Sequence, residues 1–173
     1  GLQADFGIML SWAIKEAGGE IHHDHITKED IEKAKPGQED KRLVASLVKE
    51  LSRYDRIITH YGNDFRYDVP FIRTRAVAMR IPFPHYGTLK HSDTFPILKK
   101  KFRLSRNRQE TAARTLIGHT EKDHLDGATW RAAARGNAKA IKYIVNHNLK
   151  DVRDLERLWN AISPYVKIGG TSL

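Results

Sequence analysis

The 173-residue sequence contains no cysteine, which excludes disulfide bonds and thiolate metal sites. Any metal bound by this chain must therefore use oxygen or imidazole ligands. The sequence also has no apolar run of about 18 residues and no charged-then-apolar opening of the secretory type. We therefore expect no membrane span, and we expect the protein to act in the cytoplasm.

Sequence motifs of several enzyme classes are missing too. Neither GxxxxGK(S/T) nor GxGxxG occurs, so the chain lacks the glycine-rich phosphate-binding loops of those classes. GxSxG is absent and there is no thiol, so hydrolysis through a serine or cysteine nucleophile has no support in the sequence.

Positive charge, in contrast, is in excess. Thirty Lys and Arg against 21 Asp and Glu leave a net charge of +9. Such an excess favours a polyanion as partner, because phosphates exchange their counterions for Lys and Arg, although a solvated basic surface is the simpler alternative. The segment 99–108 is dense in basic residues and also contains Phe102 and Leu104, which indicates an ordered docking surface.

The apolar pattern predicts one α/β domain over residues 1–166, with early strands, a helical C-terminal half and a flexible tail at 167–173. Two strands are expected on either side of the turn at 17–19, and further strands at 56–62 and 86–91. Helices are expected over 40–54, 68–79, from Ser92 or Asp93 onward, over 107–119 with Gly118 as C-cap, and through most of 127–162.

Two carboxylates have sequence neighbours typical of a metal site. Asp68 follows a predicted strand and begins a helix, where an N-cap would be the ordinary role, and Asp151 would ordinarily be a solvated helix residue. However, Asn63-x-x-x-Tyr67-Asp68 resembles the second motif of DEDD-type 3′–5′ exonucleases of the RNase H-like superfamily. Three further segments resemble parts of the same group, which is related to the exonuclease domains of family B DNA polymerases: 67–76, 91–94 and 147–151.

This resemblance implies an RNase H-like mixed sheet flanked by helices and a two-metal reaction with Mg²⁺ or Mn²⁺ that releases nucleotides from single-stranded DNA or RNA, DNA being favoured. It assigns Asp68 and Asp151 as metal ligands and His147 as the base that orients the attacking water. No protein partner is indicated. Residues expected to contact the substrate are Asn63, Tyr67, Phe71, Arg73, Arg75, Lys100, Arg103 and Arg106, with Lys99, Lys101 and Arg108 as further phosphate contacts.

The chain departs from the family pattern in two places. The first motif, Asp-x-Glu-Thr-x-Gly-Leu, would supply two more carboxylates and a central strand, but the chain opens on residues that resemble those just after it. We expect a longer natural protein to carry the pair, because Gly1-Leu2 begins in the middle of that motif. Without the pair the site would bind metal weakly and be inactive; Asp5 is a partial substitute or, more simply, a turn residue. His147 stands four residues before Asp151, where the family usually has Tyr, and Tyr143 is the reserve candidate for the base.

Two other functions remain open, and two polar clusters are given simpler interpretations. A non-catalytic nucleic-acid-binding module would explain the missing motif, and an RNase H-like endonuclease shares the carboxylate chemistry.

The cluster 22–25 is expected to be a solvated edge strand, with His22 and Asp24 on one face and His23 and His25 on the other. His119, Asp123 and His124 are expected to lie in a loop. Asp93 is expected to be an N-cap or a support for the site.

Overall fold

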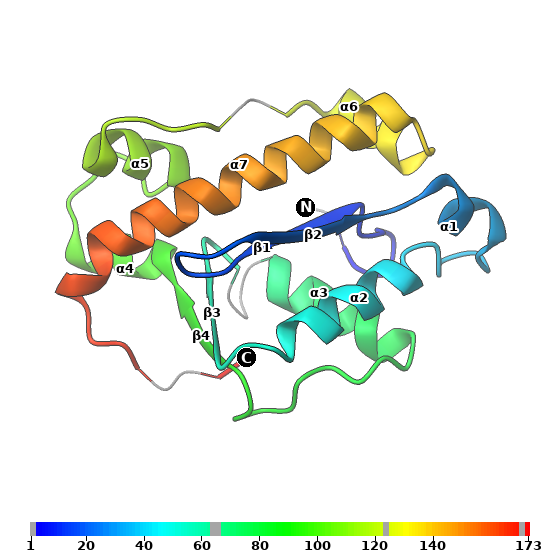
Figure 1. Cartoon of the computed structure of the whole chain (residues 1–173), viewed down its shortest axis with the longest axis horizontal. Coiled ribbons are helices and arrows are strands. Elements are labelled where there is room, and N and C mark those ends of the chain that lie inside the picture. The colour runs from blue at the N-terminus through cyan, green and yellow to red at the C-terminus, as the bar shows by residue number, and fades with distance from the viewer. Residues whose placement is uncertain (1–2, 63–66, 123–124, 170–171) are drawn as a thin grey trace.

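The computed structural model describes residues 3–62, 67–122, 125–169 and 172–173 (Figure 1). Its strands are β1 (Ser11–Lys15), β2 (Ile21–His25), β3 (Arg56–Thr59) and β4 (Lys90–Asp93). Its α-helices are α1 (Lys28–Lys33), α2 (Lys41–Leu51), α3 (Asp68–Ala78), α4 (Thr94–Lys101), α5 (Gln109–Ile117), α6 (Gly127–Ala134) and α7 (Ala138–Ile162), followed by the 3₁₀ turn η1 (Ser163–Tyr165). None of the helices in these described ranges is long and apolar enough to cross a bilayer.

The strands pair in both directions, which confirms the predicted α/β class. β1 and β2 form an antiparallel hairpin, with Ser11 opposite His25 and Lys15 opposite Ile21. β3 and β4 run parallel, with Thr59 opposite Asp93, and the chain between them crosses over through α3. Within the described residues these pairs form two separate sheets, and no strand joins them.

The hairpin is sandwiched between helices. α7 contacts β1 and β2 on one side, while α2 contacts β2 and α3 on the other (Figure 1). α2 forms as predicted because its apolar residues recur at helical spacing and are all buried in the larger core: Leu43, Val44, Leu47, Val48 and Leu51. The contacts of α7 with β1 and β2 fix its position relative to the rest of the domain.

A smaller core joins α4, α5 and the end of α7. Leu98, Ala112, Leu158 and Ile162 are fully buried there, and Phe102 and Leu104 pack against them partly buried. The basic segment 99–108 is therefore anchored by its apolar residues, which confirms that it is ordered. α5 ends at Gly118 with φ 91°, a left-handed C-cap as predicted.

Two predicted segments differ from the structure. The strand expected at 86–91 begins only at Lys90, because the Thr88 N–H bonds the His85 carbonyl at 3.1 Å and Gly87 has φ 88°, which makes a turn. The tail expected to be flexible ends in a docked residue: Leu173 is buried, and its N–H donates to the Leu89 carbonyl at 2.9 Å. An apolar C-terminal side chain with a backbone partner gains more by packing than by remaining in water.

Candidate active site

The candidate site lies where β3 and β4 both end, since the carboxyl ends of parallel strands share one edge of a sheet. At this edge the carboxylate of Asp93 accepts three backbone N–H groups: those of Tyr61 at 2.9 Å, Gly62 at 2.9 Å and Phe95 at 2.8 Å. Asp93 is thus both the N-cap of α4 and the support of the segment that follows β3. The predicted N-cap role of Asp93 is confirmed, and its role as a support for the site stays a prediction.

Asp68, the first residue of α3, has an unfavourable electrostatic environment. Burial raises its pKa to about 6, with the negative charges of Asp93 and Asp151 adding to the effect and Lys122 opposing it. The Asp68 side chain is nevertheless exposed, so protein atoms surround the carboxyl group on most sides and water reaches it on one side. The charges of three carboxylates, on α3, at the end of β4 and on α7, therefore act on one another, although their oxygens do not all lie within 4.8 Å of one another.

Asp151 also has a carboxyl group, but its surroundings shift the pKa in the opposite direction. It lies in the middle of α7, where His147 Nε2 is 3.2 Å and Lys122 Nζ is 3.4 Å from its carboxylate oxygens. Burial by itself would raise the pKa of Asp151, but the hydrogen bond from His147 and the charge of Lys122 outweigh it and lower the pKa. The expectation that His147 shares a helix face with Asp151 is therefore confirmed.

Two buried polar atoms at this site have no hydrogen bond. They are Asp151 Oδ1 and His147 Nδ1. Lys122 contacts Oδ1 at 3.4 Å as an ion pair but without the geometry of a hydrogen bond. A divalent cation would satisfy such an oxygen and would also favour ionised Asp68, so the residues present fit Mg²⁺ or Mn²⁺, which often bind through only one or two carboxylates.

His60 and Lys122 belong to the site but were missed by the sequence interpretation. Burial lowers the pKa of His60 to about 4 against the opposing charge of Asp93, so the ring is neutral at pH 7. Its Nδ1 lies 2.8 Å from Thr94 Oγ1. A polar residue directly after a strand could have indicated His60. Lys122 lies in the segment interpreted as a loop, of which Asp123 and His124 fall outside the described residues.

Other predicted site residues have different outcomes. Tyr67 is 40% exposed and stacks on Phe71 with ring centroids 5.3 Å apart. Phe71 itself is only 7% exposed within the core, so its predicted contact with substrate is wrong and it supports Tyr67 instead. Asn63 lies outside the described residues. Asp5 is exposed in a turn closed by the Phe6 N–H and the Gln3 carbonyl, as its simpler interpretation predicted.

The prediction that Arg75 contacts phosphate is also wrong. Arg75 is 6% exposed and pairs with the fully buried carboxylate of Asp40, while its guanidinium also donates to the Gly37 carbonyl at 2.8 Å. The Asp40 carboxylate accepts the Met9 N–H at 2.7 Å, so the pair ties three segments together. A buried charge needs such a partner, and Arg75 is the one that α3 presents. Arg73 instead lies over the Phe83 ring at 5.6 Å.

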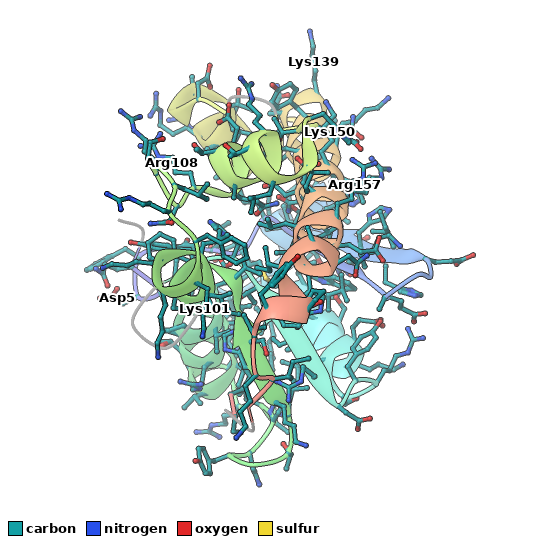
Figure 2. The ribbon with its side chains drawn as sticks, turned by 90° about the vertical axis from the view of Figure 1, so that its left-hand side faces the viewer. Asp5, Lys101, Arg108, Lys139, Lys150 and Arg157 are labelled. Carbon is teal, nitrogen blue, oxygen red and sulfur yellow. The ribbon has the colours of Figure 1, made fainter. Side chains whose placement is uncertain are left out.

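The predicted basic segment is exposed. Lys100, Arg103 and Arg106 are all exposed, and Figure 2 shows Lys101 and Arg108 on the same side of the molecule, where α4, α5 and the end of α7 lie. Tyr143, the alternative base, is 42% exposed on α7.

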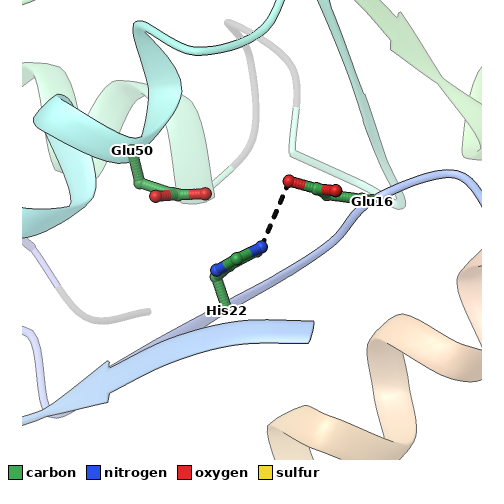
Figure 3. Close-up of side chains that lie close together, drawn as sticks. All are labelled: Glu16, His22 and Glu50. Carbon is green, nitrogen blue, oxygen red and sulfur yellow. Dashed lines mark hydrogen bonds and ion pairs between the residues drawn. The ribbon is translucent and has the colours of Figure 1, made fainter. Parts of the chain in front are cut away.

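The hairpin and α2 carry a cluster of possible metal ligands that is tighter than the set at Asp68 and Asp151. Glu16, His22 and Glu50 place ligand atoms within 4.8 Å of one another and are the only such group among the residues described (Figure 3). Arg53 already bridges the two glutamates at 3.0 and 2.8 Å, so the cluster has its own cation. The predicted edge strand is confirmed, and on this face its partly exposed side chains are paired: His22 contacts Glu16 at 3.1 Å and Asp24 contacts Arg42 at 2.7 Å.

Comparison with known protein families gives a match. A family model described as the RNase H superfamily matches residues 19–163, which include both Asp68 and Asp151. No curated protein matches the sequence.

Proposed function

The chain belongs to the RNase H superfamily, and from this premise we propose that it is a metal-dependent 3′–5′ exonuclease acting on single-stranded nucleic acid, with DNA favoured over RNA. The family supports a nuclease-type hydrolase, and the finer activity is our proposal. The observation that supports it is that Asp151 Oδ1 is buried without a hydrogen bond, and burial together with the charges of Asp93 and Asp151 raises the pKa of Asp68 to about 6.

In this proposal Asp68 and Asp151 hold the metal. Bound Mg²⁺ or Mn²⁺ would supply a nucleophilic water and stabilise the charge that develops on the phosphate. His147 is the proposed base, and it exchanges its contact with Asp151 for one with the attacking water. Lys122 holds Asp151 ionised before the metal binds. Asp93 is committed to three backbone N–H groups, so we assign it a supporting role.

The substrate side of the proposal uses two exposed features. Tyr67, supported from behind by Phe71, offers an aromatic surface one residue before Asp68. Lys100, Arg103 and Arg106 offer charges for the phosphate backbone. Single-stranded nucleic acid fits this combination, because its bases are free to stack and its phosphates follow a basic surface.

The activity is tested with 5′-labelled single strands and Mg²⁺ or Mn²⁺. Both the 173-residue chain and the product of its full coding sequence are assayed. Progressive shortening from the 3′ end is expected of the form that carries the first motif, and in that form Asp68→Asn or Asp151→Asn should slow it by about 100-fold, the scale on which losing one charge-stabilising group slows a reaction. Asp55→Asn is the matched control, since Asp55 is exposed at the start of β3 and should leave the rate unchanged.

Other outcomes would replace the proposal. Salt-sensitive binding without cleavage by either protein would favour a non-catalytic nucleic-acid-binding module. Cuts within a circular single strand, which has no 3′ end, would favour an endonuclease.

A further inference from the structure

Asp154 is a buried carboxylate that has no role in the proposed reaction. It is only 1% exposed and lies on α7 three residues after Asp151, so the two side chains share one face of the helix. A charge in the interior needs partners, and the segment 120–122 supplies two of them. Asp154 Oδ2 accepts the Thr120 hydroxyl at 2.6 Å and the Glu121 N–H at 2.9 Å. Asp154 therefore fastens this segment to α7.

The same segment is held at two further points. Glu121 Oε1 lies 2.6 Å from Arg157 Nη1, which also reaches Asp154 Oδ1 at 3.4 Å. The Thr120 hydroxyl makes two hydrogen bonds, because it donates to Asp154 and accepts the N–H of Lys122 at 3.1 Å. The backbone of Lys122 is thus linked to Asp154 through a single hydroxyl group.

This anchoring determines where the Lys122 ammonium lies. Lys122 Nζ is 3.4 Å from Asp151 Oδ1, the buried oxygen that has no hydrogen bond. A lysine side chain is long and flexible, so a fixed position for its ammonium requires a fixed backbone. Only 32% of the Lys122 side chain is exposed, so solvent screens its charge less than that of a surface lysine. Lys122 therefore places a positive charge beside the oxygen that a metal ion would bind.

We propose that Asp154 is a positioning residue that holds Lys122 against Asp151 and thereby lowers the affinity of the site for its metal ion. This inference rests on the proposed function, since it takes Asp151 as a metal ligand, and it adds a residue that sets how tightly the metal binds. A like charge within about 4–6 Å repels a cation, so a divalent ion that binds Asp151 either displaces the ammonium or is bound more weakly.

The Lys122 ammonium has a second effect before the metal binds. Its charge acts on Asp68 as well as on Asp151, and it favours the ionised form of both carboxylates. Lys122 thus stabilises the charged, metal-free site and weakens metal binding by the same interaction.

The test measures the affinity for Mn²⁺ at pH 7 by isothermal titration calorimetry, with the product of the full coding sequence. Lys122→Met removes the charge and keeps most of the side chain, so it should lower the Kd for Mn²⁺ about tenfold, the scale on which a nearby charge changes the affinity for a cation. Lys142→Met is the matched control. Lys142 is exposed on α7 about two and a half turns before Asp151, on the opposite side of the helix, and its Kd should not change.

Thr120→Val tests the link between Asp154 and Lys122. It is preferred to a change at Asp154 itself, because removing a buried carboxylate would leave its other partners unpaired. The valine keeps the shape of the threonine side chain but lacks the hydroxyl that joins Asp154 to the Lys122 backbone. The ammonium is then free to move away from Asp151, and the Kd for Mn²⁺ should fall about threefold, within the range for loss of one hydrogen bond.

The double variant separates positioning from a general structural effect. In Lys122→Met the ammonium is already absent, so adding Thr120→Val should change the Kd no further, whereas independent effects would add. The inference is overturned if the Kd does not fall in Lys122→Met, if it does not fall in Thr120→Val, or if Thr120→Val has the same effect in both backgrounds. Mn²⁺ binding with the expected pattern but no shortening of labelled strands would overturn the exonuclease and leave the role of Asp154 standing. Shortening of strands with an unchanged Kd in both variants would do the reverse.

Discussion

At the scale of single residues, Asp68 and Asp151 show how position sets the behaviour of one chemical group. Asp151 has His147 and Lys122 against its carboxylate, which lower its pKa despite burial. Asp68 is subject to burial and to two like charges, and its pKa rises to about 6. Surroundings that shift the pKa values of two carboxylates in opposite directions are typical of functional sites, because an isolated structural aspartate gains nothing from such a shift.

The raised pKa of Asp68 predicts how metal affinity depends on pH. A metal binds the carboxylate and not the acid, so protons compete with it below about pH 6, and the affinity for Mn²⁺ should rise about tenfold between pH 5 and pH 7. Asp151 does not contribute to this rise, since its pKa is lowered and it is already ionised. Isothermal titration calorimetry in two buffers of different ionisation enthalpy measures both the affinity and the proton released.

Asp68→Asn provides the control for this prediction. The variant should bind Mn²⁺ more weakly and without the rise between pH 5 and pH 7. If the rise persists in Asp68→Asn, a histidine beside the site is responsible for it and our interpretation of Asp68 is wrong.

At the scale of elements, Arg42 joins three of them. From α2 its guanidinium donates to Asp24 on β2 at 2.7 Å, to Asp30 on α1 at 2.8 Å and to the His25 carbonyl at 2.7 Å. Burial would raise the pKa of both aspartates, but the hydrogen bonds from Arg42 outweigh it, so both pKa values are lowered. The hairpin on which α7 packs is thus fixed to α2 by charge as well as by apolar contact.

Removing Arg42 should lower stability only where its partners are charged. Because the folded pKa values of Asp24 and Asp30 are lowered, their contribution is present above about pH 4 and is lost as the pH falls through the folded values. Arg42→Met should therefore lower the free energy of unfolding by about 1 kcal/mol at pH 7, a modest value because solvent screens the half-exposed guanidinium, and by much less at pH 2.5.

Urea unfolding at the two pH values measures this difference. Arg114→Met is the matched control, since Arg114 pairs with Glu110 within one exposed helix and should contribute little at either pH. Equal losses for Arg42→Met at both pH values would show that its side chain acts through packing and not through charge.

At the scale of the whole molecule, the surroundings of the exposed basic residues distinguish a candidate phosphate-binding surface from a surface whose charges are paired within one helix. The basic segment 99–108 lies near one end of the long axis and α1 lies at the other (Figure 1). Exposed lysines occur at both ends, but those of α1 face glutamates of the same helix, as Lys28 faces Glu32 at 3.4 Å. Only the basic residues of segment 99–108 lie on the side of α4 and α5, where the phosphates of a strand bound at the site would continue.

The salt dependence of binding should distinguish the two sets. Replacing Lys100, Arg103 and Arg106 together by Gln should reduce the slope of log K against log salt for a single strand by about 2, because each lost phosphate contact removes about 0.7. The same net charge is removed by changing Lys28, Lys33 and Lys35 to Gln, and that control should leave the slope unchanged. Equal effects from both triple variants would mean that only net charge matters and that the basic segment is no interface.

Patterns within one segment were enough to predict most of the helices and to identify candidate residues for the site. The spacing of Leu43, Leu47 and Leu51 determines α2, and Gly118 ends α5, because helix periodicity and capping act over a few residues. The basic segment and its apolar anchors could be predicted for the same reason. Asp68 and Asp151 were identified from their immediate neighbours in sequence.

Pairings between distant segments could not be predicted in this way. Nothing near Arg75 in the sequence indicates that it will meet Asp40 in the interior, and nothing near Leu173 indicates that it will dock on Leu89. Phe71 turned inward for a related reason, since the face of a short helix that becomes buried depends on what packs against it.

The sequence by itself therefore determined which residues could carry charge, metal or a helix, since these are properties of side chains and of local spacing. The tertiary structure alone decided which of them meet: it set Lys122 and His147 against Asp151, exposed Asp68 to the charges of Asp93 and Asp151, and held the Tyr61 backbone through Asp93. Such contacts depend on the packing of the whole chain, because the residues involved lie on different elements and come together only when α7 is fixed against the hairpin.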